Sequence, residues 1–274
     1  MKAILRVLLV AMLCWFSAAV DAQTARERVS LNGTERITLH SEKIGYTYEL
    51  LISLPADYAT STKRYPVLYV LDGWHFPLMA FLQDNAEFSK RMPPLVIVNI
   101  SHGDVSGKDL NRVRARDFTP TVVKQTSSGG HADAFLDFLE REVIPLVDRT
   151  YRTDVTDRAI LGHSLGGLFA MYCLEHRPDL FGRIVAASPV ASYDNNLLIR
   201  GVDGLKLTRP VRLDISTGSD EPNNWPQAAA DLAKALDKAG IPNLSHQFHR
   251  YEGENHDSVR LASFPAGLYW VYKN

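Results

Sequence analysis

Apolar residues along this chain form short unbroken runs separated by longer segments with helical spacing. A strand buried on both faces of a parallel sheet shows no polar alternation, so these runs are expected to be such strands. The runs cover residues 67–71, 95–100, 159–161, 184–187 and 211–215.

Both ends of this region carry further strand and helix patterns. Residues 38–41 and 46–54 alternate between apolar and polar positions around a turn at Gly45, as expected of half-exposed edge strands. A last strand is predicted around 244–251 and a final helix near 258–272.

Helical patterns lie between the runs. Residues 132–147 repeat apolar side chains at helical spacing, with Pro145 expected to kink the end of the helix. Residues 227–238 carry one apolar face, and Gly240 is a C-terminal stop signal. Strands that alternate with helices predict an α/β fold, a doubly wound and mostly parallel central sheet with helices on both faces.

The first 22 residues read as a targeting signal. Two basic residues precede an apolar run over residues 8–20, and small residues then predict cleavage before Gln23. The run is too short to span a bilayer comfortably, so no stable membrane insertion is expected after cleavage. We therefore expect a signal peptide at 1–22, a single catalytic domain at 23–274, and a periplasmic or secreted location.

Charge and composition exclude several classes of protein. The chain has 30 Lys and Arg against 31 Asp and Glu, which leaves no basic excess for nucleic acid. Only two cysteines are present, Cys14 in the signal segment and Cys173 in an apolar helical stretch, where a buried inert thiol is expected. The sequence contains no zinc-binding, dinucleotide-binding or phosphate-binding motif, so no metal and no cofactor are predicted.

The strongest chemical signal is the segment Gly-His-Ser-Leu-Gly-Gly at 162–167. It follows a predicted strand and opens a predicted helix, which is the context of a G-x-S-x-G nucleophile elbow. Ser164 is therefore the candidate nucleophile. The N–H of Leu165, at the start of the helix, is a candidate donor to a developing oxyanion.

A serine nucleophile needs a base that accepts its proton near neutral pH. His256 lies in a polar loop after the last predicted strand, last in the chain order serine, acid, histidine. The loop after the run 211–215 offers two adjacent carboxylates, Asp220 and Glu221, and either satisfies the order. The turn after 67–71 contains Gly73, and the N–H of Trp74 is the candidate for the second oxyanion donor.

These segments resemble the "putative esterase" branch of the α/β-hydrolases. The resemblance rests on residues 65–73, 162–170, 177–182 and 188–189, and it runs from about Glu35 to the C-terminus. This branch includes siderophore esterases, S-formylglutathione hydrolases and mycolyltransferases. By resemblance, the triad acid lies three residues after the glycine that ends its strand.

That spacing favours Glu221 over Asp220. By the same resemblance, the family's oxyanion turn aligns with residues 72–74, which supports Trp74 in the oxyanion hole. The stretch 112–120 is similar to a loop that borders the active site of siderophore esterases, so Arg114 and Arg116 are candidates to attract an anionic ligand, although a solvated basic loop is an equal alternative. Trp225 is a candidate to line the pocket, with a core or capping role as the alternative.

The sequence therefore predicts a serine esterase that acts on a small-molecule carboxylic ester through an acyl-enzyme. Siderophore trilactones are the specific substrate expectation, with general short-acyl or aryl esters as the alternative. An acyltransferase would use the same triad. A non-catalytic binding protein on the same scaffold is a further reading, although no triad member is missing from the sequence.

Overall fold

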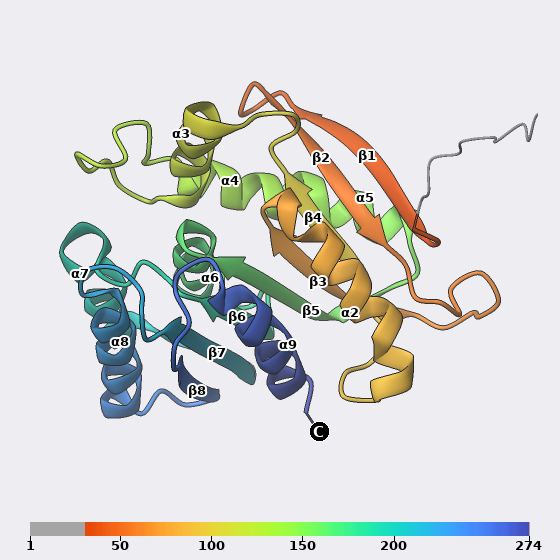
Figure 1. Cartoon of the computed structure of the whole chain (residues 1–274). Helices are drawn as coiled ribbons and strands as arrows, with labels where there is room; N and C mark the ends of the chain where they lie inside the picture. Colours follow the sequence, from red (N-terminus) through yellow and green to blue (C-terminus); the bar gives the residue numbers. More distant parts are fainter. Residues whose placement is uncertain (1–30, 274) are drawn as a thin grey trace, which may run out of the picture. The chain divides into compact units, whose positions relative to one another are not determined.

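The computed structural model describes residues 31–273, so the predicted signal peptide at 1–22 lies outside the described residues. Within residues 31–273 the strands form one eight-stranded sheet in the order β1-β2-β4-β3-β5-β6-β7-β8 (Figure 1). The strands are β1 (Thr34–Ser41), β2 (Tyr46–Ser53), β3 (Tyr65–Leu71), β4 (Val96–Ser101), β5 (Thr153–His163), β6 (Arg183–Ala187), β7 (Val211–Gly218) and β8 (Leu244–Tyr251).

The helices connect these strands. They are η1 (Gly73–His75), α2 (Phe76–Ser89), α3 (Gly107–Phe118), α4 (Ala132–Phe138), η2 (Leu139–Val143), α5 (Ile144–Thr150), α6 (Leu165–His176), α7 (Tyr193–Gly201), η3 (Val202–Gly204), α8 (Trp225–Ala239) and α9 (Val259–Val271). The predicted α/β class is therefore confirmed, with a mostly parallel sheet.

The sheet is parallel except at one edge. β1 pairs antiparallel with β2, and β2 pairs antiparallel with β4, whereas β4, β3, β5, β6, β7 and β8 are all parallel. Each predicted apolar run became a parallel strand. Because parallel strands end at the same edge, the loops after β3, β5, β7 and β8 can contribute to one site.

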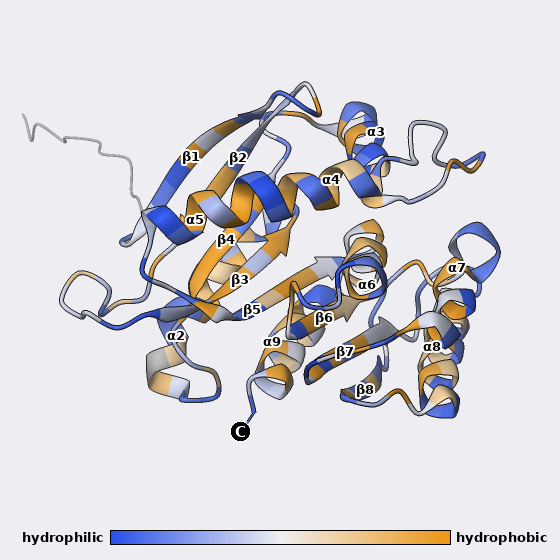
Figure 2. Ribbon diagram, turned by 180° about the vertical axis from the view of Figure 1, so that it is seen from behind, coloured by the Kyte–Doolittle hydropathy of each residue, from blue (hydrophilic) through white to orange (hydrophobic). Residues whose placement is uncertain are grey.

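Two apolar clusters cover the two faces of the sheet. On β3, Val67, Tyr69 and Leu71 face the larger cluster, which includes residues of α4, α6 and α8, whereas Leu68 and Val70 face the cluster of α2 and α9. This alternation follows the period of two along a strand. Figure 2 shows mostly hydrophobic colours on the central strands β3 and β4, and alternating hydrophobic and hydrophilic bands along α4 and α5.

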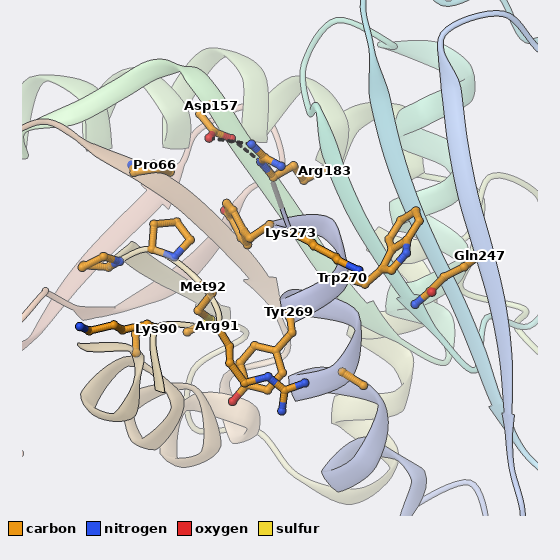
Figure 3. Close-up of a pocket in the computed structure, with 15 residues that line it drawn as sticks. Pro66, Lys90, Arg91, Met92, Asp157, Arg183, Gln247, Tyr269, Trp270 and Lys273 are labelled. Carbon is orange, nitrogen blue, oxygen red and sulfur yellow. Dashed lines mark hydrogen bonds and ion pairs between the residues drawn. The ribbon is translucent and has the colours of Figure 1, made fainter. Parts of the chain in front are cut away.

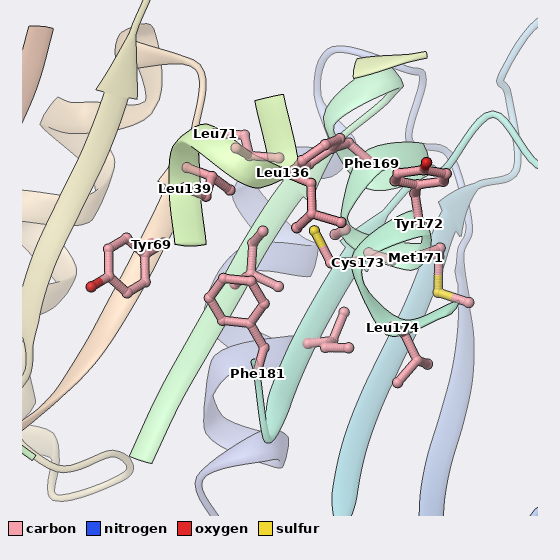
Figure 4. Close-up of a cluster of buried hydrophobic side chains, with 14 of the residues drawn as sticks. Tyr69, Leu71, Leu136, Leu139, Phe169, Met171, Tyr172, Cys173, Leu174 and Phe181 are labelled. Carbon is pink, nitrogen blue, oxygen red and sulfur yellow. The ribbon is translucent and has the colours of Figure 1, made fainter. Parts of the chain in front are cut away.

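α6 is the helix most enclosed by this packing. Its residues from Gly166 to Leu174 are buried, and Figure 4 shows Phe169, Cys173 and Leu174 among the side chains of the neighbouring elements. Burial raises the pKa of the Cys173 thiol well above its usual value. The expectation of a buried, unreactive thiol at Cys173 agrees with this placement.

The helix predicted at 132–147 differs in its ending. Residues 139–143 form a π-helical turn, and the chain then continues through α5 to Thr150. Pro145 lies in the first turn of α5, where its missing N–H is tolerated. The irregularity therefore precedes Pro145 and does not end the helix there. Gly240, in contrast, adopts the left-handed conformation that was expected at the end of α8.

Candidate active site

Ser164 lies between the end of β5 and the start of α6, in a strained backbone conformation. Its φ is 61° and its ψ is −122°. A non-glycine residue in such a region costs about 1–3 kcal/mol, which the surrounding structure must offset. A Cβ on Gly162 would lie 2.1 Å from the carbonyl oxygen of Gly166, and one on Gly167 would lie 3.0 Å from that of Ala187. Helix and strand therefore cross too closely for side chains at these two positions.

Hydrogen bonds of the backbone hold this turn in place. The N–H of Ser164 donates to the carbonyl oxygen of Ala187 at 3.0 Å, and its own carbonyl accepts from the N–H of Leu168 at 3.0 Å. Leu165 is the first residue of α6, so its N–H has no intrahelical acceptor and lies at the positive end of the helix dipole. The side-chain hydroxyl of Ser164 makes no hydrogen bond to any residue in the range 31–273.

Glu221 lies in the loop after β7 with its carboxylate almost fully enclosed. The side chain is 1% exposed. Its Oε1 accepts hydrogen bonds from Ser188 Oγ at 2.5 Å, Thr217 Oγ1 at 3.0 Å and the Gly218 N–H at 2.7 Å. Burial alone would raise the pKa of Glu221, but the hydrogen bonds from His256, Ser188 and Gly218 outweigh it and hold the pKa below its usual value. The side chain is therefore an ionised acceptor at neutral pH.

The second carboxylate oxygen of Glu221 contacts His256. His256 Nδ1 lies 2.8 Å from Glu221 Oε2. Because an ionised carboxylate only accepts, Nδ1 donates this hydrogen bond, and in the neutral form of the imidazole Nε2 then has a free lone pair. Asp220, the alternative acid, is exposed, and its Oδ1 accepts a hydrogen bond from Ser219 Oγ instead. The structure thus brings Glu221 to His256 and leaves Asp220 in solvent.

His163, the residue before the candidate nucleophile, contacts the same loop. Its Nε2 donates to the carbonyl oxygen of His256 at 2.8 Å, and the two rings lie 4.4 Å apart between centroids. This contact brings the nucleophile turn and the His256 loop together. Burial, and to a smaller extent the neighbouring His256, lowers the pKa of His163 well below its usual value. His163 is therefore neutral and acts as a hydrogen-bond donor from Nε2.

The turn after β3 carries the predicted second oxyanion donor, Trp74. Asp72 has a φ of 73°, and a Cβ on Gly73 would lie 2.4 Å from Cβ of Ser101. A Cβ on Gly166 would lie 3.4 Å from Leu71 Cβ and 3.6 Å from Asp72 Oδ2. The Trp74 turn and the first turn of α6 are therefore packed against each other beside Ser164.

Arg114 and Arg116 are both paired with buried aspartates. Arg114 donates from Nε and Nη2 to the two carboxylate oxygens of Asp72, at 2.8 and 2.9 Å. Arg116 donates to both oxygens of Asp117 and to the hydroxyl of Tyr48. The sequence suggested that these arginines attract an anionic ligand. In the folded chain their charges are already balanced by Asp72 and Asp117, which sequence reasoning did not identify as partners.

Trp225 opens α8, and its ring packs edge-on against His256 with 4.7 Å between centroids. It therefore borders the site rather than the core. Ser188 and Thr217 are site residues that the sequence did not reveal. Ser188 directly follows β6, and Thr217 is the next-to-last residue of β7. The hydroxyls of both donate to the buried carboxylate of Glu221.

A groove of about 1060 Å³ lies elsewhere, between the end of α2 and α9 (Figure 3). Its lining includes the ion pair of Arg183 with Asp157 and the ring of Tyr269, and none of the triad candidates.

Among residues 31–273, no group of three or more acidic, histidine or cysteine side chains is arranged to hold a metal ion. Over the same part of the chain, none of the helices has the length and apolar character needed to cross a bilayer.

The sheet, the strained serine turn and the Glu221–His256 pair define an α/β-hydrolase fold. A solved structure of an IroE-like serine hydrolase from Shewanella oneidensis superposes with a TM-score of 0.78 at 28% identity, over 88% of this chain and 80% of that one.

The family model described as "Putative esterase" matches residues 41–259, and the chain belongs to this family. The chain is 27% identical over 254 residues to the ferri-bacillibactin esterase BesA of Bacillus subtilis (strain 168), covering 84% of this chain and 86% of that protein. It is 29% identical over 280 residues to the siderophore triacetylfusarinine C esterase of Aspergillus fumigatus, covering 90% and 95%. The protein is accordingly a carboxylic ester hydrolase.

Proposed function

We propose that this protein is a serine esterase that cleaves siderophore esters through an acyl-enzyme. The observation that carries the serine mechanism is the hydrogen bond between Glu221 and His256, formed at the edge of the sheet where the strained turn presents Ser164. A base oriented by a buried carboxylate beside a serine on such a turn is the arrangement used for acyl transfer.

In the first half of the reaction, the Ser164 oxygen attacks the ester carbonyl carbon and its proton passes to His256 Nε2. The carbonyl oxygen becomes an oxyanion, which the N–H groups of Leu165 and Trp74 stabilise. The carbon–oxygen bond to the leaving alcohol then breaks, and that alcohol takes the proton from His256. The product is an ester between the acyl group and Ser164.

In the second half, water attacks the acyl-enzyme and gives its proton to His256. Collapse of the second tetrahedral intermediate breaks the bond to Ser164, which recovers the proton and releases the carboxylic acid. Throughout both halves, Glu221 accepts a hydrogen bond from the Nδ1–H of His256. It also stabilises the imidazolium form of His256, which arises twice in each cycle.

The substrate class rests on the names of the relatives. BesA is described as a ferri-bacillibactin esterase and the Aspergillus protein as a siderophore triacetylfusarinine C esterase. Both alignments extend over more than four-fifths of each chain. Export by the predicted signal at 1–22 would place such an enzyme in the periplasm or outside the cell, and sequencing of the exported protein should then find Gln23 first.

The test of the mechanism compares Ser164→Ala with Ser61→Ala on a p-nitrophenyl ester. Ser61 lies in the loop before β3, at the opposite end of the strand from the Trp74 turn. We expect a loss of at least about 10³-fold in kcat for Ser164→Ala and wild-type kinetics for Ser61→Ala. Undiminished turnover by folded Ser164→Ala would reject the mechanism.

The test of the substrate is a comparison of specificity constants. Ferric and iron-free trilactones, a feruloyl ester and a short aryl ester are offered to the same preparation. We expect the highest kcat/KM for a trilactone. A higher value for the aryl or feruloyl ester would assign the chain to general ester hydrolysis, and transfer of the acyl group to an added alcohol in preference to water would assign it to acyl transfer.

A further inference from the structure

One guanidinium group contacts the residues on both sides of Gly73. Arg114, in α3, donates to both carboxylate oxygens of Asp72. The Cζ of Arg114 also lies 5.0 Å from the centre of the Trp74 ring. Asp72 and Trp74 are the neighbours of Gly73 in the turn that presents the Trp74 N–H. Arg114 therefore contacts this turn at both of its ends, at Asp72 and at Trp74.

Besides Arg114, a long hydrogen bond from the His75 N–H to the carbonyl oxygen of Asp72, at 3.3 Å, closes the turn. Asp72 adopts a φ of 73°, which L-residues avoid, and Gly73 is too close to Ser101 for any side chain. Trp74 is 41% exposed, so core packing does not anchor its ring. A two-pronged hydrogen bond to a fully buried carboxylate restricts both the position and the rotation of Asp72.

The same ion pair lies against the other half of the oxyanion site. A Cβ on Gly166 would be 3.6 Å from Asp72 Oδ2, so the carboxylate is next to the first turn of α6. That turn supplies the N–H of Leu165. Two donors serve one oxygen only when both point to the same place, and small displacements of either weaken stabilisation of the transition state.

We propose that Arg114 is a positioning residue of the oxyanion hole: by clamping Asp72 and stacking on Trp74, it aims the Trp74 N–H at the point that the Leu165 N–H also faces. This inference rests on the proposed serine esterase function. It gives Arg114 a role that does not require contact with the substrate.

The chain contains a matched control for this clamp. Arg183 donates from Nε and Nη2 to the two oxygens of Asp157, and its Cζ lies 4.6 Å from the centre of the Tyr272 ring. The pair lies in the groove of Figure 3, whose lining includes no triad candidate. Loss of the Arg183 fork should therefore cost stability without changing the chemistry at Ser164.

The experiment measures kcat and KM for a p-nitrophenyl ester in Arg114→Lys, Arg114→Gln and Arg183→Lys. It also measures inhibition by an arylboronic acid, whose tetrahedral adduct with a serine places a boron-bound oxygen in the oxyanion site. Each variant is assayed well below its own melting temperature, so that the rates report folded protein. Lysine keeps the charge of Arg114 but loses the planar fork.

We expect both Arg114 variants to lose about 10–100-fold in kcat, part of the 10²–10³-fold that removal of an oxyanion donor costs, with KM changed less than about threefold. Boronate affinity should fall by a similar factor. Arg183→Lys should keep kcat, KM and boronate affinity within about threefold of wild type, with at most a lower melting temperature.

Three results would overturn the positioning role: folded Arg114→Lys and Arg114→Gln with wild-type kcat, a loss confined to KM, or failure of the charge-conserving Arg114→Lys to fold. Failure of the proposed function itself is recognised separately. It would appear as full activity in Ser164→Ala, or as no hydrolysis of any ester by the wild-type protein.

Discussion

His163 Nε2 donates a hydrogen bond to the carbonyl oxygen of His256 at 2.8 Å, so the residue beside the nucleophile supports the loop of the base. His163 is 4% exposed, and the centroid of its ring lies 4.4 Å from that of the His256 ring. This contact links the end of β5, just before the nucleophile turn, to the loop after β8.

Replacement of His163 by Phe should test this link. Phenylalanine keeps an aromatic ring beside His256 but leaves its carbonyl without the donor. We expect a loss of about 1–3 kcal/mol in the free energy of unfolding, the cost of an unsatisfied buried polar group, together with a lower kcat. Urea denaturation and steady-state kinetics measure the two effects. Wild-type stability and kcat in the variant would show that the loop is held by other contacts.

Glu221→Gln and Asp220→Asn should separate the two candidate acids. Glutamine keeps the shape of Glu221 but removes the charge that orients and stabilises protonated His256, so we expect kcat to fall by about 10²–10⁴-fold. Asp220→Asn changes an exposed side chain and should leave kcat within about twofold. A larger loss in Asp220→Asn would reverse the assignment.

The lowered pKa of Glu221 also has a consequence for stability. A carboxyl group with a depressed folded pKa stabilises the fold above its unfolded pKa, and this contribution is lost as the pH falls through the folded value. The free energy of unfolding in Glu221→Gln should therefore change less than in wild type as the pH falls below the ordinary glutamate pKa of 4.5.

Asp214 is a buried carboxyl group that should have the opposite pH dependence. It is 2% exposed on β7, one oxygen accepts a hydrogen bond from Gln247, and burial raises its pKa to about 6. The folded state then binds more protons than the unfolded state between about pH 4 and 6, so this group lowers stability as the pH rises through that window.

In Asp214→Asn that decline should be absent. We expect a gain of up to about 3 kcal/mol in the free energy of unfolding at pH 7, and little change at pH 4. Denaturation of both proteins at several pH values measures the difference. Equal pH profiles for the two proteins would show that Asp214 does not titrate in this range.

Gly162→Ala should prevent formation of the nucleophile turn. Its new Cβ would lie 2.1 Å from the carbonyl oxygen of Gly166, which is backbone and cannot rotate away. We expect a destabilisation of more than about 4 kcal/mol or no folded protein. Gly204→Ala is the control, because a Cβ there would meet nothing within 4 Å. Thermal unfolding compares the two, and a stable, active Gly162→Ala would contradict the crossing geometry.

The sequence predicted those parts of the molecule that depend on local pattern. The parallel strands were recognisable because each is a continuous apolar run, and Ser164 because the glycines around it are imposed by a close helix–strand crossing. His256 became a candidate from its polar loop and its place in the chain order. Each of these signals is contained in a short segment or in the order of segments.

The partners of charged side chains were not predictable in the same way. Arg114 and Asp72 are 42 positions apart, and they meet only because the fold brings α3 to the turn after β3. A run of arginines in a polar stretch indicates a solvated or ligand-binding surface until the buried carboxylate is known. Likewise, the proline at 145 indicated a kink, whereas the irregularity is a π-helical turn at residues 139–143, which the apolar pattern did not indicate.

Within the part of the chain that the structure describes, β8 is an edge strand that pairs with β7 alone, yet the loop that follows it carries His256. Edge strands exchange their hydrogen bonds with water more readily than central ones. Transient fraying of β8 would move the imidazole of His256 away from the site. The central strands β3 and β5 would meanwhile keep Ser164 and both N–H donors in position. Loss of turnover on gentle heating should therefore precede the collapse of the interior.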